Sequence, residues 1–154
     1  MADRAGRAPR RPRAPGAVLD RLILDTTVLI AAERATTAID EVVGDEDDVV
    51  IAAVTAAELL VGVRLADGRR EPARGAFVEA LLASIPIEPY DLEIARVHAA
   101  LLAHTRAAGR VRGAHDLLIA ATARARARTV VTTDAGGFED LPDVTLRLLP
   151  PKRR

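Results

Sequence analysis

Four acidic residues carry the chemistry that this sequence can support: Asp25, Glu58, Asp116 and Asp134. We refer to them as the site carboxylates. If folding brings them together, each pair about 4 Å apart repels by about 4 kcal/mol at an effective dielectric constant of about 20, so they must bind protons or a divalent cation. Oxygen ligands without cysteine favour Mg²⁺ or Mn²⁺ over zinc. Cations held in this way activate water and neutralise phosphate charge, which predicts a metal-dependent phosphodiester hydrolase.

The elements that must position the site carboxylates follow from the hydropathy pattern. Short apolar runs predict strands at residues 22–24, 49–52, 85–87, 129–132 and 144–148. Helical patterns occur between them at residues 28–34, 37–43, 55–66, 71–83, 91–108 and 116–126. This alternation is typical of one α/β domain whose parallel sheet carries helices on both faces. Ligands of such sheets bind beyond the carboxyl ends of the strands, where we expect all four acids.

Each site carboxylate also has a purely structural interpretation. Asp25 ends the first strand, where water is scarce, so a structural role explains it least well. Glu58 fits a capping box with Thr55. Asp116 opens a helix that is apolar nearly all round, where the helix dipole favours a carboxylate. Asp134 precedes Gly136 and Gly137 and can shape a turn. These interpretations weaken when the residues are taken together, because four acids at one edge cost free energy without a cation.

Four sequence blocks around these acids resemble the PIN-domain ribonucleases, and most closely the VapC-type toxins of bacterial toxin–antitoxin pairs. The blocks are residues 24–29 (LDTTVL), 55–59 (TAAEL), 116–123 (DLLIAATA) and 131–134 (VTTD), followed by Phe138. They agree with the family in order, spacing and context over about residues 20–149. The resemblance implies a three-layer PIN-like α/β fold, in which a short parallel sheet of four to five strands carries helices on both faces.

The resemblance also implies an activity and a set of partners. It implies that the site carboxylates hold Mg²⁺ or Mn²⁺, with Thr132 as a supporting polar group, and that the chain cleaves RNA endonucleolytically. It implies a homodimer and inhibition by a small antitoxin encoded beside the chain. The family varies between Asp and Asn at the fourth acid, and Asp134 favours full metal binding. Two alternatives within the fold stay open: a nuclease of RNA maturation without an antitoxin, and a largely non-catalytic binding and repressor partner of the antitoxin.

Charge is unevenly distributed along the chain. Residues 18–151 contain 14 basic and 21 acidic side chains, whereas residues 1–17 contain five arginines and one aspartate. We therefore predict a disordered basic leader at residues 1–17, the nuclease domain at residues 18–150 and a basic tail at residues 151–154. Similar toxins usually lack such a leader, so it is either an arm that contacts RNA or a solvated segment ahead of an initiation site near Val18.

Arginines near the predicted site have two expected roles. Arg110 and Arg112, in the loop before Asp116, are expected to steer RNA phosphates toward cations in the acidic pocket, and an ordinary basic loop is the alternative. The central helix is expected to end in three solvated arginines that complement its dipole. These are Arg124, Arg126 and Arg128.

Composition excludes several other classes of protein. The chain has no cysteine, which excludes disulfide scaffolds, thiolate zinc sites and thiol catalysis, and its 2% aromatic content excludes base-stacking platforms. No apolar run is long enough to span a membrane or to serve as a signal peptide, so we expect a cytoplasmic protein. The only lysine is Lys152, which excludes a phosphoacceptor receiver domain. Thr27 stands where a haloacid-dehalogenase-type phosphatase needs a second aspartate.

Overall fold

The central strand of the sheet is β1 (Arg21–Leu24), whose last three residues are buried. It pairs in parallel with β2 (Asp48–Ala52) on one side and with β4 (Thr129–Thr132) on the other. The edge strands are β3 (Ile87–Glu88) beside β2 and β5 (Leu146–Leu148) beside β4, which gives the order β3-β2-β1-β4-β5. Every pairing is parallel, so all five carboxyl ends lie at the same edge of the sheet.

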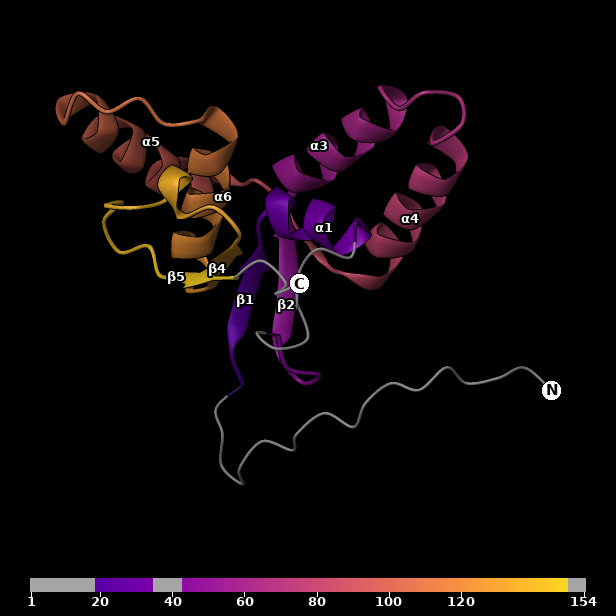
Figure 1. Ribbon diagram of the computed structural model, residues 1–154. Helices are drawn as coiled ribbons and strands as arrows, with labels where there is room; N and C mark the ends of the chain where they lie inside the picture. Colours follow the sequence, from indigo (N-terminus) through magenta and orange to yellow (C-terminus); the bar gives the residue numbers. More distant parts are fainter. Residues whose placement is uncertain (1–18, 35–42, 150–154) are drawn as a thin grey trace.

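The computed structural model describes residues 19–34 and 43–149 (Figure 1). The predicted leader at residues 1–17 and tail at residues 151–154 lie outside the described residues, as does all but the last residue of the helix predicted at residues 37–43. The described helices are α1 (Thr26–Glu33), α3 (Ala53–Arg64), α4 (Glu71–Ser84), α5 (Leu92–Ala107) and α6 (Ala114–Ala125). None of these described helices is long and apolar enough to cross a membrane.

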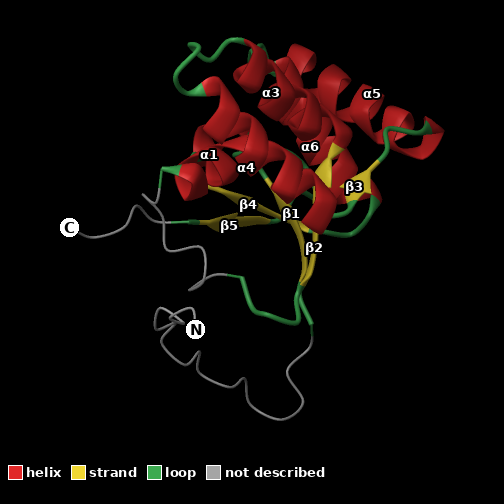
Figure 2. Ribbon diagram, turned by 90° about the vertical axis from the view of Figure 1, so that its right-hand side faces the viewer, coloured by secondary structure: helices red, strands yellow, loops and turns green. Residues whose placement is uncertain are grey.

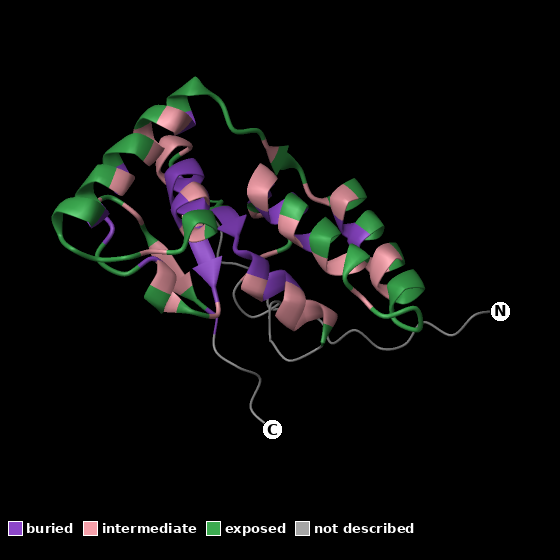
Figure 3. Ribbon diagram, turned by 90° about the horizontal axis from the view of Figure 1, so that it is seen from above, coloured by how far each residue is buried: buried purple, intermediate pink, exposed green. Residues whose placement is uncertain are grey.

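Alternate residues of β1 contact two separate apolar clusters, as the period of two along a strand requires. Ile23 belongs to the cluster that includes α5 and α6, whereas Leu22 and Leu24 belong to the cluster that includes α1, α3 and α4. Figure 1 shows these two groups of helices on opposite sides of the strands. Figure 3 shows the buried residues along the middle of the molecule, with exposed residues on the outer faces of the helices. The three-layer α/β prediction is confirmed.

Element boundaries differ from the sequence prediction by a few residues. The helix predicted from residue 55 begins at Ala53, directly after the end of β2. The strand predicted at residues 85–87 is Ile87–Glu88, because Pro86 has no backbone N–H to give to a ladder and contributes only its carbonyl, to the N–H of Ile51. A 3₁₀ turn, η1 (Ala135–Gly137), follows β4. Figure 2 shows the helices gathered around the carboxyl ends of the strands.

The prediction of solvated arginines after α6 is wrong for Arg126 and Arg128. Arg126 forms ion pairs with three carboxylates from β3 and the start of α5, and their proximity raises its pKa. Arg128 is buried, and its guanidinium donates to the carbonyl oxygen of Asp48 at 3.0 Å and pairs with the side chain of the same residue. Both side chains fasten α6 and β4 to neighbouring elements, because the chain turns back toward the sheet immediately after the helix.

Candidate active site

Asp25 occupies the carboxyl end of β1 and is the N-cap residue of α1. Its residue surface is only 3% exposed. The Oδ2 atom of Asp25 accepts hydrogen bonds from the hydroxyl groups of Thr27 at 2.7 Å and Thr132 at 2.8 Å. Burial raises the pKa of Asp25, although both hydroxyl groups act in the opposite direction. The carboxylate is therefore held in one orientation at a position where its negative charge is costly.

Thr132 connects Asp25 to the segment that follows β4. In the parallel β1–β4 pair, Leu24 lies opposite Val131, so the residues that follow them, Asp25 and Thr132, lie side by side. The fully buried Thr132 hydroxyl donates to Asp25 and accepts the backbone N–H of Asp134 at 3.0 Å. One hydroxyl group thus fixes both a side chain of β1 and the backbone that leads into η1.

Asp116 lies in the first turn of α6, and glycines border its carboxylate on two sides. A Cβ atom on Gly113 would lie 3.0 Å from Oδ2 of Asp116, and one on Gly137 would overlap the same oxygen. Burial raises the pKa of Asp116, and the negative charges of the other three site carboxylates raise it further. All four acids therefore share one electrostatic environment at the carboxyl edge of the sheet, although they come from four separate segments.

Glu58 and Asp134 both have partners within the protein. The half-buried Glu58 pairs with the Nδ1 atom of His115, the residue before Asp116 on α6. The capping-box interpretation is wrong, because α3 begins at Ala53 and the buried Thr55 hydroxyl accepts a hydrogen bond from Thr26 instead. The Oδ1 atom of the exposed Asp134 accepts the backbone N–H of Gly136 at 2.9 Å, so the turn-shaping interpretation is confirmed for one of its two oxygens.

The donor chemistry of this site fits a hard divalent cation. All four acids offer oxygen, two of them have raised pKa values, and backbone without a Cβ makes room beside Asp116. Within residues 19–34 and 43–149, no three histidine or acidic side chains are close enough to hold one ion together. The packed surroundings of Asp25 and Asp116 fix where these two carboxylates lie. Glu58 instead pairs with His115, and one oxygen of Asp134 accepts a hydrogen bond within the turn.

Arg110 and Arg112 face the segment after β4. Arg110 forms an ion pair with Asp140, and the guanidinium of Arg112 donates to the carbonyl oxygens of Gly136 and Glu139, the latter at 2.6 Å. Both arginines therefore tie the α5–α6 loop to residues 136–140. Neither this contact nor the pairing of His115 with Glu58 has a signal in the local sequence, because the partners are distant along the chain.

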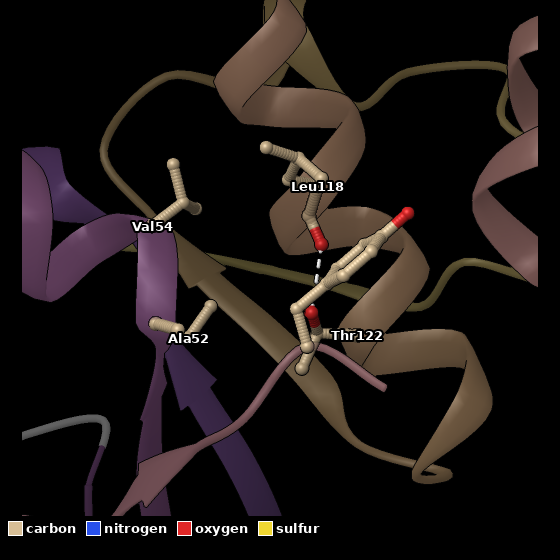
Figure 4. A pocket seen from close by; sticks show the side chains of 6 residues that line it. Ala52, Val54, Leu118 and Thr122 are labelled. Atoms are coloured by element: carbon tan, nitrogen blue, oxygen red, sulfur yellow. Dashed lines mark hydrogen bonds between the residues drawn. The ribbon is translucent and has the colours of Figure 1, made fainter. Parts of the chain in front are cut away.

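A small apolar pocket of about 190 Å³ lies between the carboxyl end of β2 and α6 (Figure 4). Its lining consists of Ala52, Ala53, Val54, Tyr90, Leu118 and Thr122. The hydroxyl of Thr122 does not serve the pocket, because it donates to the carbonyl oxygen of Leu118 at 2.8 Å. The pocket therefore offers apolar contact and no ionisable group except the half-exposed Tyr90, whose hydroxyl lies 3.0 Å from Nδ1 of His98.

The chain matches the PIN domain family over residues 22–144. It is 29% identical over 132 residues to a protein of Rickettsia bellii named Ribonuclease VapC, with 85% of this chain and 98% of the relative covered. It is 36% identical over 112 residues to Ribonuclease VapC5 of Mycobacterium tuberculosis, with 73% and 82% covered. A solved structure of VapBC-5, a member of the VapBC family of toxin–antitoxin systems from M. tuberculosis, superimposes with a TM-score of 0.69 at 32% identity, covering 82% of this chain and 96% of the other.

Proposed function

The chain belongs to the PIN-domain family, and from that membership and the geometry of its site we propose that it is a metal-dependent endoribonuclease that acts as the toxin of a toxin–antitoxin pair. Its relatives named Ribonuclease VapC and Ribonuclease VapC5 support the ribonuclease activity. The observation that carries the proposal is the placement of the four site carboxylates at the carboxyl edge of one parallel sheet, where Gly137 leaves room beside Asp116. The negative charges of the other three acids reach Asp116 and add to the rise that burial causes in its pKa. Acids that repel one another at a sheet edge need a cation, and a cation beside phosphate is the usual requirement for hydrolysing RNA.

In this proposal the site carboxylates hold Mg²⁺ or Mn²⁺ and Thr132 supports them. The cation, when bound, supplies an activated water and neutralises charge on the phosphate. The hydroxyl groups of Thr27 and Thr132 orient Asp25 for this task and oppose the rise in its pKa that burial causes. Glu58 and Asp134 contribute the remaining oxygens from α3 and from the segment after β4. No other nucleophile is required from the chain, because the attacking group comes from water.

The proposed substrate is single-stranded or looped RNA. An edge-of-sheet site suits a strand whose bases are splayed out better than it suits a duplex groove. The catalytic unit is residues 18–150, with the basic segments at either end as accessory parts. We also propose that the chain forms a homodimer and binds a small antitoxin, and the relation to the VapBC family of toxin–antitoxin systems supports the antitoxin.

Induced expression in cells, with mapping of new RNA 5′ ends, tests the function directly. The wild-type chain should arrest growth and produce discrete new ends, and the Asp25→Asn variant should do neither. Equal arrest and identical ends with Asp25→Asn would refute catalysis by this site. Co-expression of the small open reading frame adjacent to the gene should restore growth, and a gene without such a neighbour would instead favour a nuclease of RNA maturation.

A further inference from the structure

Arg112 joins two loops that border the site. Its guanidinium donates to the carbonyl oxygen of Gly136, inside η1, and to that of Glu139, just after it. The side chain is half-buried, and its Nε atom is buried without a partner among the residues that the structure describes. A planar guanidinium that spans two carbonyl groups fixes their separation as well as their distance from its own loop.

The segment held by Arg112 is the one that sets the positions of two site carboxylates. Gly137 packs so closely against Asp116 that a Cβ would overlap Oδ2. Asp134 caps the same turn through the N–H of Gly136. On the other side, Gly113 follows Arg112 directly and approaches the same Asp116 oxygen. The turn and the loop therefore enclose Asp116 between them, and Arg112 connects the loop to the turn itself, whereas Arg110 reaches only Asp140 beyond it.

We propose that Arg112 is a positioning residue, which holds η1 against the start of α6 so that Asp116 and Asp134 keep the spacing needed to share a cation. This inference rests on the proposed function. It replaces the expectation that Arg112 binds RNA phosphate, because the carbonyl groups of Gly136 and Glu139 already occupy two of its donors and its Nε is enclosed by protein. Arg110, whose side chain is 55% exposed, remains the more accessible cation of this loop.

The proposal predicts that no other side chain at position 112 can hold the two carbonyl groups as arginine does. Lysine keeps the charge but presents a single ammonium group, which cannot hold two carbonyl oxygens in a fixed plane. Groups that orient metal ligands without touching the metal typically change metal affinity by about 10–100-fold when they are removed. A residue that only binds phosphate would instead change RNA affinity and its dependence on salt.

The test uses the full-length chain and two independent readouts. The first is the Mn²⁺ dissociation constant by calorimetry, measured for wild type, Arg112→Gln and Arg112→Lys. The second is binding of a single-stranded RNA oligonucleotide in EDTA at several salt concentrations, measured for the same Arg112 changes in an Asp25→Asn background. Arg106→Gln is the matched control, since Arg106 is an exposed arginine in the last turn of α5. We expect Mn²⁺ affinity to fall about 10–100-fold in both Arg112 variants, with RNA affinity and salt slope unchanged.

Three results would contradict the proposals, and they distinguish failure of the positioning role of Arg112 from failure of the proposed function. Unchanged Mn²⁺ affinity in the Arg112 variants, beside a wild type that binds Mn²⁺, overturns the positioning role alone. Weaker RNA binding with a salt slope reduced by about one shows a phosphate contact and also overturns it. A wild type that neither binds Mn²⁺ nor cleaves RNA refutes the proposed function itself. If Arg112→Gln does not fold, Arg112→Lys, which keeps the charge and the long side chain, decides the question.

Discussion

The Thr132 hydroxyl donates a 2.8 Å hydrogen bond to the carboxylate of Asp25 across the β1–β4 pair, although the two residues are 107 positions apart in the chain. The parallel register brings the two residues together, because Leu24 lies opposite Val131 and the residues that follow them, Asp25 and Thr132, are therefore neighbours. It is a direct contact between the first and last segments of the site. Its removal should therefore affect both the stability of the fold and the orientation of Asp25.

Replacing Thr132 by valine keeps the shape of the side chain and removes its hydroxyl. Asp25 then loses a donor and the N–H of Asp134 loses its acceptor. We expect the free energy of unfolding in urea to fall by about 1–3 kcal/mol, the usual cost of leaving buried polar groups unpaired. RNA cleavage should also fall. Thr133→Val is the control, because the side chain of Thr133 lies outside this network, and equal losses in both variants would contradict the assignment.

Asp116→Asn should stabilise the cation-free protein at neutral pH. Because the pKa of Asp116 is raised in the folded state, its ionisation destabilises the fold progressively as pH rises from the unfolded pKa, near 3.8, through the folded pKa. The gain in Tm measured in EDTA should thus be present at pH 7 and vanish below about pH 4. Asp143→Asn, at an exposed carboxylate paired with Arg124, should change stability by less than about 0.5 kcal/mol. A lower Tm for Asp116→Asn at pH 7 would argue against clustered charge.

Glu58→Gln should weaken Mn²⁺ binding without unfolding the chain. Glu58 is half-buried and pairs with His115, so its amide replacement can keep a hydrogen bond there while losing the negative charge. Mn²⁺ at about 100 times its dissociation constant should stabilise wild type by about 2.7 kcal/mol, and the same concentration should stabilise Glu58→Gln much less. Glu79→Gln, an exposed change on α4, should behave as wild type. Equal stabilisation of all three proteins by Mn²⁺ would exclude Glu58 as a ligand.

Gly137→Ala tests the space beside Asp116. The added Cβ would overlap Oδ2 of Asp116, so either the η1 turn or the carboxylate must move. We expect a loss of about 1–3 kcal/mol in unfolding free energy, as overpacking usually causes, together with weaker Mn²⁺ binding. Gly68→Ala is the matched control, because nothing lies within 4 Å of a Cβ at that position. Wild-type affinity for Mn²⁺ in Gly137→Ala would mean that the position of Asp116 does not matter for the cation.

The sequence by itself determined the fold class and the edge at which the acids lie. Apolar runs of a few residues between helical patterns report burial directly, since a strand with both faces covered must be apolar throughout. Asp25 directly follows such a run at β1, and Asp134 lies two residues after the run at β4, so their place at the carboxyl edge could be predicted. The ends of elements were less certain, as at α3, because its N-cap is Ala52, which cannot cap through its side chain, whereas Thr55 in the first turn resembles an N-cap in the sequence.

Only the tertiary structure decided which groups the charged side chains contact. Arg112 pairs with carbonyl groups 24 and 27 residues away, Arg126 with acids 33 to 38 residues away, and Glu58 with the histidine beside Asp116. Such partners have no periodic signal, because a long polar side chain binds whatever complementary group the packed loops bring within reach. Periodicity records what is buried, whereas the pairing of charges depends on the distances between loops that exist only once the sheet has assembled.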